Sequence, residues 1–263
     1  MATRWRGFYQ IPTGILWTAV AYSAFIVAVV LTLGRANTVL VGWCARLWGR
    51  IVLFILSVRL EVVGRDNVRE RIPRILVFNH TSLLDLFVIC ALYPPAGVAV
   101  VKKEIARLPI VGLLWWLMGM VFIDRGNGPA AKASVARAAA KVRRLRQTII
   151  LAPEGTRSID GAIGPFKKGA FHLALETGAP IVPLVIVNAH HIQPKGKLYA
   201  QPGTLRVIFL EAIPTEGWRR ETLDAHVAAV REVYLRTLAE ERDEPAPASA
   251  VADGIYGAPR RSA

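Results

Sequence analysis

A histidine and an aspartate that follow one apolar segment have the types and spacing of a general base. The segment covers residues 75–78; His80 comes almost directly after it, and Asp85 lies early in the next apolar run. An imidazole can take a hydroxyl proton near neutral pH when a carboxylate holds its other nitrogen and stabilises the imidazolium that forms. The alternative is structural, with Thr81 or Ser82 capping a helix and the histidine in a turn. The pair alone does not decide between these interpretations.

A second polar group, residues 153–158, follows the apolar segment 148–152 and has the composition of a phosphate site. It combines a glycine, small hydroxyl residues and Arg157. Backbone amides in such a turn, beside a guanidinium, suit a phosphate monoester. Arg125, at the end of another apolar stretch, could converge on the same anion. The alternative is a tight turn with a surface arginine.

Several other chemistries lack their usual patterns in this sequence. No Gly-x-x-x-x-Gly-Lys-Ser/Thr loop occurs, and no Gly-x-Ser-x-Gly elbow marks a serine hydrolase. The adjacent His190 and His191 have no zinc-ligand spacing around them. The sequence therefore offers no support for a nucleotide loop, a serine nucleophile or a metal site.

The net charge of the sequence indicates which kinds of molecule the protein could bind. The 263 residues carry a formal charge of +14, which favours nucleic acid, an anionic membrane or an anionic substrate. No zinc-finger spacing, aromatic-basic sheet motif or basic-region zipper is present, so we expect no nucleic-acid partner. An apolar N-terminal segment makes anionic lipid the better interpretation. Both cysteines, Cys44 and Cys90, lie in apolar runs and indicate buried thiols in a reducing compartment.

Alternating apolar strands and helices must position these groups. We expect strands over residues 58–63, 74–78, 98–101, 119–125, 148–152, 181–187 and 205–212. We expect helices over residues 83–92, 129–147, 166–177 and 222–240. This alternation predicts an α/β fold with a mixed, mostly parallel sheet flanked by helices. In such sheets, sites gather at the carboxyl ends of the strands.

The N-terminal part has a different character. Residues 11–33 carry no charge and are long enough to cross a hydrocarbon core at about 1.5 Å per residue. Residues 39–58 are also apolar but place Arg46 and Arg50 on one helical face, which suits a helix at the membrane interface. Whether the first helix spans the bilayer or both helices lie in one leaflet stays open. The flanking arginines lean toward a cytoplasmic C-terminal side.

The expected organisation therefore has an N-terminal membrane-associated two-helix module, an α/β domain and a tail. The module covers residues 1–57 and the α/β domain covers residues 58–242. Residues 243–263 are rich in Pro, Ala, Ser and charge, and we expect this tail to be disordered.

Sequence blocks in a fixed order resemble a known family. They are Asn-His-x-x-x-x-Asp at 79–85, Phe-Ile-Asp-Arg at 122–125, Pro-Glu-Gly-Thr-Arg-Ser at 153–158 and Val-Pro-Leu at 182–184. This order resembles the glycerolipid acyltransferase family, which includes 1-acylglycerol-3-phosphate acyltransferases. The resemblance covers roughly residues 58 to 213, together with a two-helix N-terminal module of the kind that bacterial members carry. Each block is weakly specific, but the ordered set is highly specific.

The resemblance implies an acyl transfer at the membrane. His80 would act as general base on the free sn-2 hydroxyl of 1-acylglycerol-3-phosphate (lysophosphatidic acid), and Asp85 would orient it. The alkoxide would attack the thioester of acyl-CoA or acyl carrier protein and give phosphatidic acid, with no metal or other cofactor. We expect the protein at the cell membrane, with its active site facing the cytoplasm.

The resemblance also assigns residues to the acceptor's phosphate. Arg125 and Arg157 would hold it, together with either Lys102 or Lys103, because two adjacent lysines fit the pattern. The phosphate pocket would be completed by Glu154, Gly155 and Thr156.

Alternatives remain at the levels of substrate and of protein class. A related acyltransferase could act on another lysolipid, and a non-catalytic protein could simply bind anionic lipid, although the intact His80 and Asp85 count against the latter. The apolar run 108–122 could be core or membrane contact, or it could form the wall of an acyl-chain channel.

Overall fold

The structure consists of a central sheet, flanking helices and a helical N-terminal extension. The computed structural model describes residues 4–32, 38–70, 72–108, 111–124, 128–158 and 160–243. The strands are β1 (Val58–Val63), β2 (Arg74–Phe78), β3 (Gly97–Lys102), β4 (Val121–Ile123), β5 (Thr148–Leu151), β6 (Ile181–Ile186) and β7 (Gly203–Phe209). The helices are α1 (Arg4–Leu31), α2 (Thr38–Ile55), α3 (Leu84–Ala91), α4 (Val111–Leu117), α5 (Gly128–Leu145), α6 (Gly169–Thr177), α7 (Ala189–Ile192) and α8 (Leu223–Arg242). The 3₁₀ helices are η1 (Arg65–Val68) and η2 (Lys103–Arg107).

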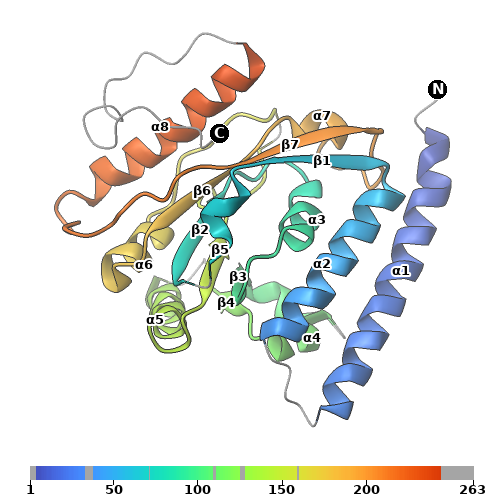
Figure 1. The fold of residues 1–263 in the computed structure, drawn as a ribbon, viewed down its shortest axis with the longest axis horizontal. Coiled ribbons are helices and arrows are strands. Elements are labelled where there is room, and N and C mark those ends of the chain that lie inside the picture. Colours follow the sequence, from blue (N-terminus) through green and yellow to red (C-terminus); the bar gives the residue numbers. More distant parts are fainter. Residues whose placement is uncertain are drawn as a thin grey trace.

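The sheet is mixed and mostly parallel, which confirms the fold class predicted from the strand–helix alternation. Its 7 strands have the order β1-β7-β6-β2-β5-β3-β4. Every pair is parallel except β6 with β7. β2 lies between β5 and β6 at the middle of this order (Figure 1). The carboxyl end of β2 therefore opens among the carboxyl ends of its neighbours, where sites in such sheets form.

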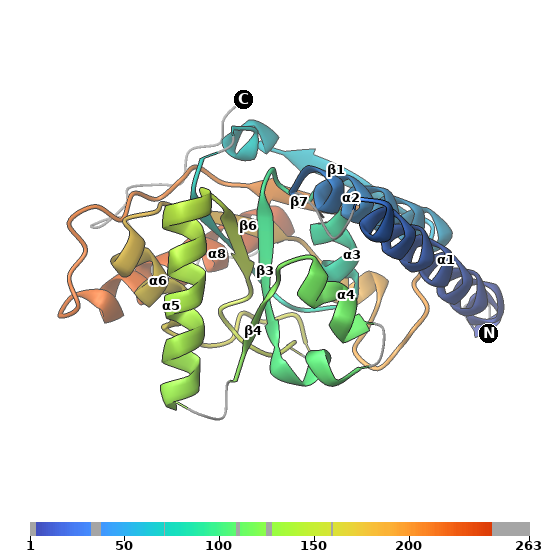
Figure 2. The same ribbon diagram turned by 90° about the horizontal axis from the view of Figure 1, so that it is seen from below.

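Helices cover both faces of this sheet (Figures 1 and 2). Buried residues of α1, α2, α3 and α4 form one cluster with Leu76 of β2. The adjacent Ile75 and Val77 face the opposite layer and pack with α5, α6 and α8. Because successive strand residues point to opposite faces, a strand that is covered on both sides must be apolar throughout. This explains the uninterrupted apolar segment before the histidine.

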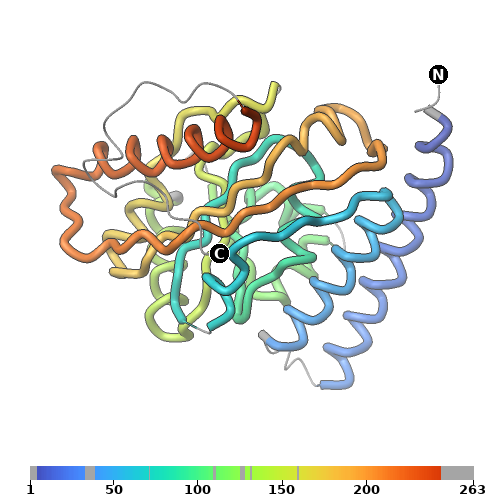
Figure 3. Tube along the Cα trace, turned by 45° about the horizontal axis from the view of Figure 1, so that its top comes forward, coloured from blue at the N-terminus to red at the C-terminus, as the bar shows by residue number. Residues whose placement is uncertain are grey.

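The N-terminal helices lie side by side at one edge of the molecule (Figure 3). At the crossing of α2 and α3, a Cβ added to Gly49 would lie 2.4 Å from the backbone nitrogen of Ala91, so the glycine permits close helix contact. α1 is the outer helix: within Trp5–Leu31 a stretch of 18 residues has a mean hydropathy of 2.2 and is only 11% buried, so the length and composition of the helix would allow it to cross a membrane. The expected pair of helices is present, and it shares a core with the α/β part.

The apolar run 108–122 contains helix α4, for which the sequence indicated no element, and it ends in β4. β4 is a shorter form of the strand expected over 119–125. Gly119 has φ +75°, a left-handed conformation that favours glycine and allows the chain to turn out of α4. Arg125 and the tail residues 244–263 lie outside the described residues, so both expectations remain predictions.

Candidate active site

A buried asparagine fixes the end of the strand that carries the histidine. Asn79 Nδ2 donates to the carbonyl oxygen of Ile186 at 2.9 Å, and its Oδ1 accepts the N–H of Ile186 at 2.8 Å. This side chain replaces the backbone pairing that β2 and β6 lose where β2 ends. His80 therefore leaves the sheet from a rigid position.

The histidine and the aspartate form the expected pair. Asp85 lies in the first turn of α3 and is fully buried; its Oδ2 is 2.9 Å from His80 Nδ1. The same oxygen accepts the backbone N–H groups of Thr81 at 2.7 Å and Ser82 at 2.8 Å. In the tautomer that places the hydrogen on Nδ1, toward the carboxylate, Nε2 is the atom available to take a proton.

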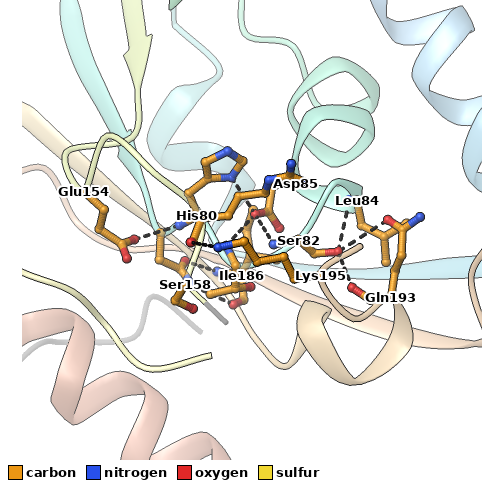
Figure 4. Close-up of polar contacts among 12 residues, drawn as sticks. His80, Ser82, Leu84, Asp85, Glu154, Ser158, Ile186, Gln193 and Lys195 are labelled. Atoms are coloured by element: carbon orange, nitrogen blue, oxygen red, sulfur yellow. Dashed lines mark hydrogen bonds and ion pairs between the residues drawn. The ribbon is translucent and has the colours of Figure 1, made fainter. Parts of the chain in front are cut away.

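Ser82 makes only a weak contact of the kind expected for a helix cap. Ser82 Oγ accepts the N–H of Leu84 at the long distance of 3.3 Å and donates to the carbonyl oxygen of Gln193 at 2.8 Å. Ser82 thus ties the start of α3 to the segment after α7, while Asp85 engages the imidazole (Figure 4). The structure therefore contains both the Ser82 contact at the start of α3 and the His80–Asp85 pair. The two do not share an atom.

Glu154, which the resemblance assigns to the phosphate pocket, contacts the backbone of the histidine. Its Oε1 accepts the backbone N–H of His80 at 2.8 Å, and its Oε2 accepts that of Gly164 at 3.2 Å. The carbonyl oxygen of His80 accepts the N–H of Ser158 at 3.0 Å, so the 153–158 block holds the histidine backbone on both sides (Figure 4). Burial raises the pKa of Glu154, and the hydrogen bonds from the His80 and Gly164 amides oppose that effect.

Most of the residues expected at the phosphate border one cavity. The histidine opens onto this cavity together with Lys102, Gly155, Thr156 and Arg157. Lys103 is engaged elsewhere: its Nζ lies 2.5 Å from Asp124 Oδ2. Of the adjacent lysines, Lys102 is thus the one that faces the cavity, at the end of β3.

Beyond this polar mouth, the cavity is apolar. Its volume is about 530 Å³, and it extends between α1, α2, α3, β3 and α4. α4 and the following residues contribute Leu114, Trp115, Met118 and Met120, whereas Trp116 lies outside the lining. The lining also includes Cys90, whose pKa burial raises to about 12, so it is a neutral thiol. The arrangement can hold an anionic group at the histidine and an extended apolar chain behind it.

Comparison with known proteins agrees with this arrangement. Residues 59–187 match the family described as Acyltransferase. A 1-acyl-sn-glycerol-3-phosphate acyltransferase from Limnanthes alba is 35% identical over 190 residues, which are 72% of this chain and 67% of that protein. The chain belongs to the acyltransferase family. This confirms the resemblance drawn from the ordered blocks, all of which lie inside the matched segment.

Further relatives of this acyltransferase come from distant organisms. The 1-acyl-sn-glycerol-3-phosphate acyltransferase of Saccharomyces cerevisiae is 30% identical over 244 residues, covering 91% of this chain and 75% of its own. The crystal structure of the 1-acyl-sn-glycerophosphate acyltransferase PlsC from Thermotoga maritima is similar with a TM-score of 0.72 at 25% identity. It covers 91% of this chain and 98% of PlsC. The likeness therefore includes the N-terminal helices as well as the sheet.

Some residues at the acyltransferase site were not singled out from the sequence. Lys195 Nζ donates to the carbonyl oxygen of Arg157 at 3.2 Å. Lys167 Nζ lies 3.0 Å from the position of a Cβ on Gly155, so it covers the outside of the same turn. Tyr234 of α8 donates to the carbonyl oxygen of Val77 at 2.5 Å. For Lys195 and Tyr234 the signal is tertiary, because each comes from a segment far from its partner in the chain.

Proposed function

We propose that this acyltransferase moves a fatty acyl group from an acyl thioester to the sn-2 hydroxyl of 1-acylglycerol-3-phosphate, giving phosphatidic acid. The observation that supports this most directly is the shared cavity: the His80 imidazole, Lys102 and Arg157 border its mouth, and apolar side chains line the rest. An acceptor with one phosphate, one free hydroxyl and one acyl chain has the same distribution of charge and apolar surface. The names of the relatives above point to the same acceptor.

His80 would carry the proton through the reaction. Its Nε2 takes the proton of the sn-2 hydroxyl as the oxygen attacks the thioester carbonyl, and Asp85 stabilises the imidazolium. The tetrahedral intermediate then collapses, the C–S bond breaks, and the imidazolium returns the proton to the thiolate. The products are the ester and a free thiol, so atoms and charge balance without a covalent enzyme intermediate. No cofactor beyond the donor, acyl-CoA or acyl carrier protein, is needed for this step.

The phosphate would be held away from the reacting hydroxyl. Lys102 and Arg157 supply charge from separate elements, and the turn of Gly155 and Thr156 borders the same space. We also assign Arg125 to this clamp, from its place in the Phe-Ile-Asp-Arg block. Fixing a remote group in this way orients the hydroxyl and lowers the entropic part of the barrier. Glu154 would contribute by holding the His80 backbone, and Lys103 would stay with Asp124.

The enzyme would work at the cell membrane, with its site facing the cytoplasm. The apolar exposed surface of α1 suits a bilayer, and both α1 and α2 line the cavity through Tyr22, Phe25 and Trp48. An acceptor could then remain in its leaflet while its headgroup reaches the histidine. The division into a helical module at 1–57 and an acyltransferase domain at 58–242 is part of this proposal.

The deciding experiment is turnover by the purified full-length protein with several acceptors and both donor types. We expect phosphatidic acid from lysophosphatidic acid, with kcat/KM well above that for the matching 1-acylglycerol, which lacks the phosphate. Equal kcat/KM for these acceptors would contradict the phosphate clamp. Preference for a lysophospholipid with a larger headgroup would instead identify another acceptor of the same family.

A further inference from the structure

Helix α4 has an exposed apolar face that the cavity does not use. Leu113 and Trp116 lie three positions apart on one side of this helix and are 57% and 67% exposed. Leu108, just before α4, is 49% exposed. The opposite side carries Leu114 and Trp115 into the cavity. α4 is therefore apolar on both sides, and only one side is covered by the described part of the chain.

The covered side of α4 lies against α1, a helix that also has an exposed apolar surface. Trp115 of α4 contacts Tyr22 of α1, and both line the cavity, so the helices lie next to each other there. α1 itself exposes large apolar side chains along its length, such as Phe8, Leu16 and Val27. Figure 2 shows α4 on the side of the sheet opposite α5, the side that also carries α1, α2 and α3.

A lipid bilayer is the partner that fits the exposed apolar surfaces of α1 and α4. In α1, a stretch of 18 residues with mean hydropathy 2.2 and only 11% burial would be unfavourable in water, and the length of the helix matches a hydrocarbon layer. Trp116 has the amphipathic ring that favours the membrane–water boundary. Arg107 lies just before α4 and is exposed, so it can face anionic headgroups.

We propose that the outer face of α4, formed by Leu108, Leu113 and Trp116, is a separate membrane contact that inserts into the same leaflet as the N-terminal helices. This inference rests on the proposed membrane location of the enzyme. It places both walls of the cavity, α1 and α4, in the lipid interface. A lysolipid could then pass its chain from the leaflet into the cavity without crossing water.

Paired surface variants test the contact. In the full-length protein, Leu113→Ser with Trp116→Ser removes the apolar face without touching the cavity lining. Leu145→Ser on α5 is the matched control, because Leu145 is 54% exposed and lies across the sheet from α1 (Figure 2). Vesicles of phosphatidylglycerol and phosphatidylethanolamine serve as the membrane. We expect the double variant to bind them about tenfold or more weakly than wild type, since two large apolar side chains lose their burial, and the control to bind normally.

A second readout separates this inference from the proposed activity. An environment-sensitive fluorophore at Leu113→Cys, with Cys44→Ser and Cys90→Ser, should shift to the blue on adding vesicles and be quenched by spin-labelled lipid. The same label at Leu145→Cys should not respond. These measurements need no turnover, so they remain valid if the acceptor is a different lysolipid.

Kinetics test whether the membrane contact helps the enzyme to use an acceptor that lies in the membrane. With acceptor embedded in vesicles, kcat/KM of the double variant should fall by about the same factor as binding, whereas a short-chain acceptor dissolved as monomers should be used at the wild-type rate. Normal vesicle binding together with an unresponsive label at position 113 would overturn the proposal. So would a Trp116-dependent dimer seen by light scattering, because a second copy would then cover this face.

Discussion

Glu154 Oε1 accepts the backbone N–H of His80 at 2.8 Å, while Asp85 Oδ2 lies 2.9 Å from the imidazole Nδ1 of the same residue. The proposed general base is thus fixed by separate carboxylates, one on its backbone and one on its ring. Glu154 reaches across from another strand end, and this makes the 153–158 block a support for the base as well as a border of the phosphate pocket.

Replacing Glu154 should lower kcat more than it raises KM for lysophosphatidic acid. Glu154→Ala leaves the buried N–H groups of His80 and Gly164 unpaired, at a cost of about 1–3 kcal/mol each. Glu154→Gln keeps one acceptor oxygen and should be milder. Steady-state kinetics would separate the effect on kcat from the effect on KM. Glu211→Gln, at an exposed position, is the control. A rise in KM with unchanged kcat would instead give Glu154 a role in phosphate binding.

The raised pKa of Glu154 predicts a pH dependence of stability. Between the ordinary pKa of a glutamate and the raised value, the native state binds more protons than the unfolded state. The stability linked to this group is therefore complete below the ordinary pKa and is lost as pH rises through the raised pKa. Thermal unfolding of wild type and Glu154→Gln in detergent from pH 4 to pH 8 tests this. As pH rises, the unfolding free energy of the wild type should fall relative to that of Glu154→Gln. A difference that stays constant with pH would exclude the effect.

Removing the dyad should abolish most turnover and leave membrane binding intact. For His80→Ala we expect a loss of about 10²–10⁴-fold in kcat, the usual contribution of a positioned general base. Asp85→Asn should also be slow, because the ring loses its anionic partner and its tautomer control. His191→Ala, an exposed histidine, is the control. A well-folded His80→Ala enzyme with near-normal kcat would rule out the mechanism.

The adjacent lysines should behave differently. Lys102 borders the cavity, so Lys102→Ala should raise KM for lysophosphatidic acid by about tenfold, a value reduced from that of a buried contact because the side chain is largely exposed. Lys103 is paired with Asp124, so Lys103→Ala should change KM much less. Kinetics of both variants at low and high salt would resolve them. The reverse order would move the clamp to Lys103.

Donor chain length should respond to residues that line the cavity and ignore those that do not. Met118→Ala or Trp115→Ala should extend the preferred chain, since each buried methylene contributes about 0.8 kcal/mol. Trp116→Ala should leave the profile unchanged. Gly112→Leu is not a clean way to shorten the preferred chain, because an added Cβ would lie 2.3 Å from the Ala106 carbonyl oxygen. Identical product profiles across a series of acyl-CoA lengths would show that the segment only packs.

The two N-terminal helices are an example of elements that composition alone predicts. Their apolar character and the arginines of α2 are visible in the sequence, and the structure contains both helices. Their contact with α3 depends on Gly49 and on a partner helix that lies much later in the chain. For this reason deletion of residues 1–57 would also remove a wall of the cavity, and surface substitutions are the better test of membrane contact.

By itself, the sequence determined the alternation of strands and helices and the ordered blocks, and it named His80 and Asp85 as candidates for a pair. These are local properties: strand ends, short spacings and apolar periodicity are written within a few consecutive residues. Only the tertiary structure decided that Lys102 faces the cavity, that Glu154 holds the histidine backbone, and that α4 has one covered and one exposed side. Each of these depends on contacts between segments distant in the chain, and the direction of a side chain relative to such a partner is fixed only when the layers pack together.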